Sequence, residues 1–134
     1  MPHLKIEYTA NIDAQADMGT LCKALAKVLV ELRDDQGQPV FPTGGTRVLA
    51  YPAPYHAVAD GKQDYAFVYL NLRIAAGRSD AIKKVAGDAL LARTKAHFES
   101  LFSTTLMGIT LQIDEGAPVF DAKHSNIHSL FNNP

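Results

Sequence analysis

The sequence DYAFVYLNLRI, residues 64–74, is the longest strand predicted in this chain, and the other elements can be placed around it. It is dense in β-branched and aromatic residues, as strands are. Its residues alternate in character, so the two faces of the strand differ. We expect Ala66, Val68, Leu70, Leu72 and Ile74 on one face, and Tyr65, Phe67, Tyr69, Asn71 and Arg73 on the other.

A helix and a second strand are predicted on the C-terminal side of this stretch. The turn AAGRSD (75–80) offers Ser79 or Asp80 as a helix N-cap, and the helix runs to about Phe102. The strand LMGITLQID (106–114) follows, and an irregular tail with one short helical turn ends the chain. The expected buried side of the helix comprises Ile82, Val85, Ala86, Ala89, Leu90, Phe98, Leu101 and Phe102.

The same order of elements is predicted on the N-terminal side. A strand at residues 3–8 places Leu4, Ile6 and Tyr8 on one face. The segment MGTLCKALAKVLVELR (18–33) has apolar residues at helical spacing, and Arg33 is placed in its last turn, where a cation suits the helix dipole. A short strand, TRVLAY (46–51), lies between two loops rich in Gly, Pro and Asp.

These elements predict an α/β (α+β) two-layer sandwich, with two β-α-β units forming a four-stranded sheet that has two helices on one face. Each crossover is long enough to make its two strands parallel. We expect a single domain over residues 1–134, with repeat one at about 2–53, repeat two at about 64–115 and a tail at 116–134. Either the aromatic face or the Val and Leu face of the sheet stays uncovered, so we predict an oligomer.

Composition narrows the class of protein. The chain has 134 residues, a net charge of −1 and one cysteine, so an intrachain disulfide is excluded and nothing in the total charge points to nucleic acid. No apolar run approaches the length of a spanning helix, and no signal-peptide pattern opens the chain. We therefore expect a soluble cytoplasmic protein that contacts neither nucleic acid nor membrane.

Pro2 has two interpretations. Proline is tolerated at the start of a strand, where its missing N–H costs little. If Met1 is removed, however, Pro2 becomes a secondary amine at the chain terminus, and such an amine can act as a base. Burial and neighbouring cations would lower its pKa towards the working pH, where a general base is most effective.

Five stretches of the chain resemble the tautomerase superfamily, and within it the 5-carboxymethyl-2-hydroxymuconate isomerase branch. They are MPHLKIEY (1–8), FPTGGTR (41–47), ADGKQDYAFVYLNLRIAAGRS (59–79), KAHFESLF (95–102) and HSNIHSLF (124–131). Together they span nearly the whole chain in order. The chain departs from the pattern in a longer loop at 33–42 and in Leu49 and Ala50, which stand where relatives carry a second basic residue.

The resemblance implies an isomerase that moves a proton in a polycarboxylate dienol, most specifically 5-carboxymethyl-2-hydroxymuconate in homoprotocatechuate catabolism. It implies that Pro2 is the general base and acid, that Arg47 contacts a carboxylate or oxyanion, and that Arg78 binds substrate. Arg73 is a weaker candidate. The resemblance also implies a homotrimer and a reaction that requires no metal and no organic cofactor.

Other interpretations remain open at the level of sequence. Arg47 and Arg78 also fit solvated loop positions. His124 and His128, four residues apart, would share one face of a helix, but a surface location explains them better than a zinc site. The competing functions are another tautomerase activity on a different keto acid and a non-catalytic oligomeric module that binds ligands.

Overall fold

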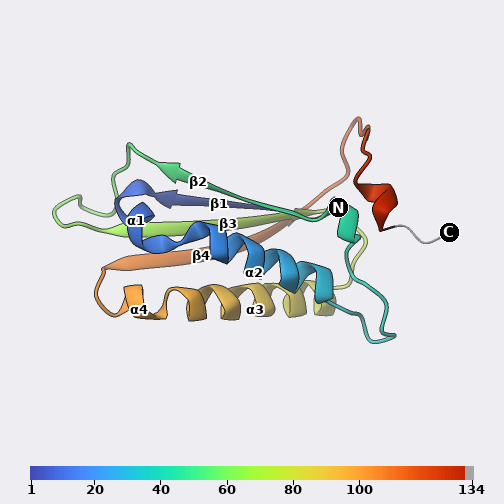
Figure 1. Cartoon of the computed structure of the whole chain (residues 1–134), viewed down its shortest axis with the longest axis horizontal. Coiled ribbons are helices and arrows are strands. Elements are labelled where there is room, and N and C mark those ends of the chain that lie inside the picture. Colours follow the sequence, from blue (N-terminus) through green and yellow to red (C-terminus); the bar gives the residue numbers. More distant parts are fainter. Residues whose placement is uncertain (132–134) are drawn as a thin grey trace.

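A computed structural model describes residues 1–131 and shows a four-stranded sheet with its helices on one face (Figure 1). The predicted fold class is confirmed. In chain order the elements are β1 (His3–Thr9), η1 (Ala10–Ile12), α1 (Asp13–Ala16), α2 (Met18–Glu31), η2 (Thr43–Gly45), β2 (Arg47–Ala53), β3 (Ala66–Ile74), α3 (Asp80–His97), α4 (Glu99–Phe102), β4 (Met107–Glu115) and η3 (His128–Leu130).

The strand order is β2-β1-β3-β4. β1 is parallel to β2, with His3 opposite Arg47, and β3 is parallel to β4, with Arg73 opposite Asp114. The two central strands, β1 and β3, are antiparallel, and His3 also lies opposite Arg73. The sheet therefore consists of two parallel β-α-β units joined antiparallel at their centre, with α2 and α3 as the crossovers that parallel pairs require.

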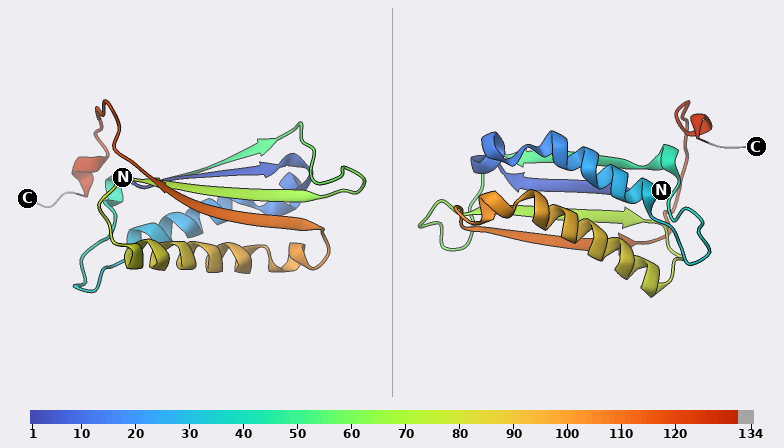
Figure 2. Two further views of the ribbon diagram at one scale, coloured as in Figure 1. Left: turned by 180° about the vertical axis from the view of Figure 1, so that it is seen from behind. Right: turned by 60° about the horizontal axis from the view of Figure 1, so that its bottom comes forward.

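The core lies between the sheet and α2 and α3 (Figure 2). The predicted alternation of β1 and β3 is confirmed, and the structure shows which face is buried: Leu4, Ile6 and Tyr8 are buried, as are alternate residues of β3 from Ala66 to Ile74. On the helices, the fully buried side chains recur at a spacing of four residues, which is the period of a helical stripe facing a sheet. They are Leu21, Leu25 and Leu29 of α2 and Leu90 and Thr94 of α3.

The N-cap of α3 is Ser79, one of the two predicted candidates, and its Oγ accepts the Ile82 N–H at 3.2 Å. The buried side of this helix departs from prediction at two residues. Val85 and Phe102 were expected to be buried, and both expectations are wrong, since they are 54% and 56% exposed. Val85 lies one position around the helix from the buried stripe, and Phe102 belongs to α4, which begins after α3 ends at His97.

The first helix ends earlier than predicted. α2 stops at Glu31, so Arg33 lies beyond its last turn rather than within it. Its guanidinium nevertheless donates to the carbonyl oxygens of Val30 and Leu32, at 2.9 and 3.0 Å. The predicted contact between a cation and the carbonyl end of the helix is thus made from the following loop.

The aromatic face of the sheet is the uncovered one. Phe67 and Tyr69 of β3 share it with Tyr51 of β2, and Phe67 and Tyr51 are 37% and 47% exposed. Polar contacts cross this face: the Tyr69 hydroxyl donates to Gln112 at 2.9 Å, and Asn71 Nδ2 donates to Asp114 at 2.8 Å. The left view of Figure 2 shows this face without a helix over it.

Beyond β4, residues 116–131 contain the predicted short helical turn, which is η3. The last three residues of the predicted tail, 132–134, lie outside the described residues. Within residues 1–131, no helix is both long enough and apolar enough to cross a bilayer.

We predict that Leu90→Ala lowers the free energy of unfolding by about 2–5 kcal/mol. Leu90 of α3 is fully buried, so its truncation leaves a cavity in the core. Val85→Ala, on the exposed side of the same helix, should change it by less than about 0.5 kcal/mol. Urea denaturation of both variants checks this. Equal losses would contradict the assignment of the buried stripe.

Candidate active site

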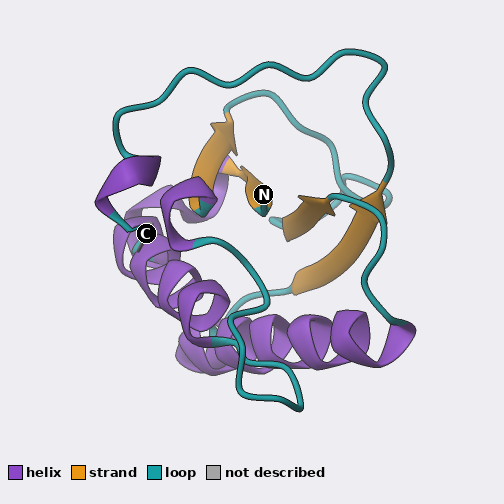
Figure 3. Cartoon of the chain, turned by 90° about the vertical axis from the view of Figure 1, so that its right-hand side faces the viewer, coloured by secondary structure: helices purple, strands orange, loops and turns teal. Residues whose placement is uncertain are grey.

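A cavity of about 370 Å³ lies at one end of the sheet, where β1 and β2 begin and β3 and β4 end. Figure 3 views the molecule from this end, with the amino terminus among the strand ends. The charged and polar groups of its wall come from three places: the amino-terminal residues, the ends of β2 and β3, and the C-terminal segment. They are Met1, His3, Arg47, Arg73, Asp121 and Lys123.

Strand pairing holds the amino terminus in this position. Pro2 is buried, and its carbonyl oxygen accepts the main-chain N–H of Arg47 at 3.3 Å, which extends the β1–β2 pairing by one residue. Met1 packs on η2, where a Cβ added to Gly45 would come within 2.6 Å of the Met1 side chain. A glycine at position 45 therefore lets the terminal residue approach the main chain.

The terminal amine lies in a partly buried, cationic environment. Burial is the largest cause that lowers the pKa of the Met1 amine, and the charges of Arg78, Lys123 and Arg47 lower it further. Asp121 opposes them. Because burial and cations both disfavour a protonated amine, a base placed at this end of the chain stays neutral at lower pH than in water.

Arg47 is oriented by its neighbours. Its Nε–H donates to Nδ1 of His3 at 2.8 Å, and a second guanidinium nitrogen donates to the Gly45 carbonyl at 3.1 Å. His3 must therefore be unprotonated at Nδ1. Burial is the largest cause that lowers the pKa of His3, followed by the charges of Arg47 and Lys5, so the neutral imidazole is favoured.

Arg73 completes a row of three side chains on the uncovered face of the sheet. In the strand register, Arg47 and Arg73 lie opposite His3, one on each side. Both arginines line the cavity, and with Lys123 they face one carboxylate, that of Asp121. The cavity wall thus has an excess of positive charge, which suits an anionic ligand.

The guanidinium of Arg78 is held by main-chain contacts. Arg78 does not line the cavity, and three hydrogen bonds tie its guanidinium to main-chain oxygens, two to Val40 at 3.1 and 3.3 Å and one to Ala75 at 3.3 Å. It also stacks 4.7 Å from the centre of the Phe41 ring. Its charge nevertheless acts on the terminal amine more strongly than any other cation does.

Of the predicted site residues, the structure places Arg47 in the cavity wall with Arg73, the weaker candidate, and pairs the main chain of Arg47 with Pro2, which is buried behind Met1. His3, Asp121 and Lys123 were missed as site residues. Alternation in β1 already placed His3 on the face of Arg73 across the sheet, so a signal for it existed once the register was known. The C-terminal segment has no periodicity from which the position of Asp121 or Lys123 could have been predicted.

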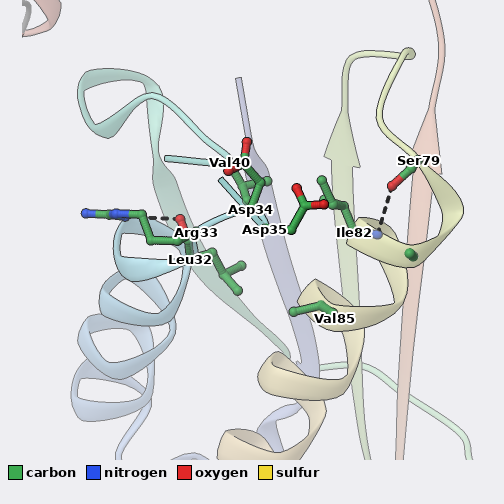
Figure 4. Close-up of a pocket in the computed structure, with 9 residues that line it drawn as sticks. Leu32, Arg33, Asp34, Asp35, Val40, Ser79, Ile82 and Val85 are labelled. Atoms are coloured by element: carbon green, nitrogen blue, oxygen red, sulfur yellow. Dashed lines mark hydrogen bonds between the residues drawn. The ribbon is translucent and has the colours of Figure 1, made fainter. Parts of the chain in front are cut away.

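A second cavity, of about 220 Å³, lies between the loop after α2 and the start of α3 (Figure 4). Its walls include Leu32, Val40, Ile82 and Val85, and its acidic residues are Asp34 and Asp35. The guanidinium of Arg33 points away from it and binds the end of its own helix. This cavity is unsuited to a polyanion. Within residues 1–131, no three His, Cys, Asp or Glu side chains lie close enough together to hold a metal ion, and this includes His124 and His128.

Comparison with solved structures confirms the fold. The structure of a fused 4-OT, described as a wild type symmetric trimer, matches 96% of this chain and 98% of its own with a TM-score of 0.58 at 18% identity. The fused 4-OT therefore shares the fold of this chain, in which two β-α-β units are joined in one sheet.

The family follows from closer matches. The model of the 5-carboxymethyl-2-hydroxymuconate isomerase family matches residues 2–131. The 5-carboxymethyl-2-hydroxymuconate Delta-isomerase of Escherichia coli is 35% identical over 98% of this chain and 99% of its own length. A crystal structure of a 5-carboxymethyl-2-hydroxymuconate delta-isomerase is 48% identical, with a TM-score of 0.95 over 100% of this chain and 95% of the other. The chain belongs to this family, and it is an isomerase.

We predict that the pKa of His3, measured by NMR titration of its ring protons, lies below the usual value of 6.5 and rises in Arg47→Gln. Removing the guanidinium removes a charge that disfavours the imidazolium. Arg93→Gln, on the far helix layer, is the matched control and should leave the titration unchanged. An unaltered pKa in Arg47→Gln would contradict the contact between Arg47 and His3.

Proposed function

We propose that this isomerase converts 5-carboxymethyl-2-hydroxymuconate to its unsaturated 2-oxo isomer, with Pro2 as the base and acid after removal of Met1. The observation that carries the proposal is the cationic cavity around the amino terminus, where the terminal amine has a lowered pKa. Two relatives are named as isomerases of 5-carboxymethyl-2-hydroxymuconate, which supports the choice of a dienol with several carboxylates.

The proposed reaction needs one proton carrier. The neutral Pro2 amine accepts the proton of the 2-hydroxyl group, which leaves a dienolate. The protonated amine then returns a proton to a carbon of the dienolate, and the 2-oxo group forms. The rigid pyrrolidine ring holds the nitrogen lone pair in a fixed direction, and a pKa near the working pH serves both steps.

Arg47 is proposed to stabilise the negative charge that develops on the substrate, or to bind its carboxylate, because a guanidinium pairs with both and stays charged. We propose that Arg78 contributes to substrate binding. A guanidinium has five N–H groups, and three of those in Arg78 are taken by main-chain oxygens. The remaining N–H groups and the charge itself are what it offers the substrate.

We further propose a cytoplasmic homotrimer, formed from a single domain that comprises the two repeats and the tail. The uncovered sheet face, with Phe67, Tyr51 and Leu49 each more than a third exposed, is the surface that assembly would cover. The fused 4-OT of the same fold is described as a symmetric trimer, which supports this number of subunits.

The trimer predicts a mass in solution of three times the 14.5 kDa of the chain. Light scattering after size-exclusion chromatography measures it. Phe67→Glu should reduce the mass, because it places a charge on the face that is covered. A wild-type protein of 14.5 kDa at micromolar concentration would contradict the trimer.

Turnover is predicted to depend on a free Pro2 nitrogen. Two samples would be compared: one with a cleavable extension before Pro2, and the same protein after cleavage to a terminal Pro2. The extension makes the nitrogen an amide, which is no base, so cleavage should raise kcat/KM by about 10²–10⁴-fold, the usual contribution of a general base. Ketonisation is followed by ultraviolet absorbance.

Two controls accompany this experiment. Pro2→Ala, also cleaved to a free terminus, keeps a primary amine and should retain part of the activity. Intact mass establishes the terminus of every sample. Equal activity before and after cleavage would contradict Pro2 as the base.

A further inference from the structure

We propose that the C-terminal segment, residues 116–131, forms part of the substrate site, and that Lys123 binds one carboxylate of the substrate. Lys123 would then determine specificity for dienols with several carboxylates. This inference rests on the proposed function, because it concerns the substrate of the same cavity.

The path of the segment brings Lys123 to the amino terminus. Figure 3 shows the segment leaving the end of β4, arching around the amino terminus and returning to the protein beyond the opposite edge of the sheet. It ends at η3, which packs on η2. A Cβ added to Gly44 would lie 2.6 Å from His128 Cα, so this contact is made against the main chain itself. The segment is therefore held at both ends, with Lys123 between them.

A local turn stabilises the anchored end of the segment. The Oγ atom of Ser125 accepts the main-chain N–H groups of Ile127 and His128, at 3.0 and 3.3 Å. Pro118, Asp121 and Lys123, which precede this turn, all line the cavity. The segment is thus a wall of the cavity rather than a peripheral tail.

The charge of Lys123 is available to a ligand. Its ammonium group pairs with the carboxylate of Asp121, and both side chains are 53% exposed. An exposed ion pair of this kind contributes little to stability, so a substrate carboxylate can take the place of Asp121 at small cost. The charge also reaches the reacting end of the chain, because Lys123 is second to Arg78 among the cations that lower the pKa of the Met1 amine.

Two arginines line the cavity, Arg47 and Arg73, so a substrate with more than two carboxylates leaves a role for a third cation. The proposed substrate has three carboxylates. Arg47 uses its Nε–H on His3 and another N–H on the Gly45 carbonyl, and Arg78 lies outside the cavity wall. Lys123, by contrast, is paired with a carboxylate in the cavity, the chemical group that the substrate would present.

The first test is kinetic. Lys123→Met should raise KM for 5-carboxymethyl-2-hydroxymuconate by about 10-fold or more, the effect of losing a hydrogen bond to a charged group, and change kcat little. KM for the enol of phenylpyruvate, which has one carboxylate, should stay the same. Lys123→Arg should restore most of the lost affinity, and Lys62→Met, in the exposed loop before β3, is the matched control. An unchanged KM for the tricarboxylate in Lys123→Met would overturn the inference.

The second test moves the segment without removing a charge. Gly44→Ala adds only a methyl group, but that group meets His128 Cα, so η3 should be displaced and KM for the tricarboxylate should rise as in Lys123→Met. Gly19→Ala, where no atom lies within 4 Å of the added Cβ, is the control. Wild-type kinetics in Gly44→Ala would contradict the anchoring of the segment.

A binding measurement separates this inference from the proposed reaction. Calorimetry with tricarballylate, a non-reacting tricarboxylate, should show affinity in the wild type that weakens about 10-fold in Lys123→Met, the loss of a hydrogen bond to a charged group. If the wild type fails to convert the muconate but shows this difference, the proposed substrate is wrong and Lys123 still binds a polycarboxylate. If the muconate is converted and neither KM nor binding depends on Lys123, the inference alone fails.

Discussion

The pairing of β1 with strands on both sides is the constraint on which the rest of the structure depends. β1 is parallel to β2 and antiparallel to β3, so it cannot shift without breaking both ladders. This pairing reaches back to the Pro2 carbonyl and buries Pro2 at the sheet end. The terminus of the chain, usually its least ordered part, thereby becomes a fixed group in a cavity.

The position of the terminus also explains its electrostatics. The register sets His3 between Arg47 and Arg73 on the uncovered face, at the same end as Pro2. The lowered pKa values of His3 and of the terminal amine have common causes in burial and in Arg47. A neutral His3 in turn accepts the Nε–H of Arg47. The same positive charge that suits the cavity to an anionic ligand thus also lowers the pKa of the terminal amine, in addition to the larger effect of burial.

The alternation of residues 64–74 and the repeated order of elements were enough to predict the strands, the residues that share each face and the parallel pairs, whereas which face the helices cover was left open. The alternation is a local property of the sequence, and a strand keeps its two-residue period when it pairs in a sheet. The side of α3 on which Val85 lies depends on the angle at which the helix packs, which the sequence does not encode locally. Likewise, Arg78 was assigned from a motif, and only tertiary contacts with Val40 and Phe41 show where its guanidinium lies. Lys123 lies in a segment without periodicity, so its place by the amino terminus follows from long-range packing of η3 on η2.

The central claim is that the fold provides a terminal proline amine that is neutral at the working pH. The most direct test is an NMR titration of the enzyme labelled with ¹⁵N-proline, after removal of Met1. The account predicts a pKa of the Pro2 amine below the usual value for a free terminal amine, and the same pKa in the acidic limb of kcat/KM. A pKa at or above the usual value, or an acidic limb that does not follow it, would contradict the account.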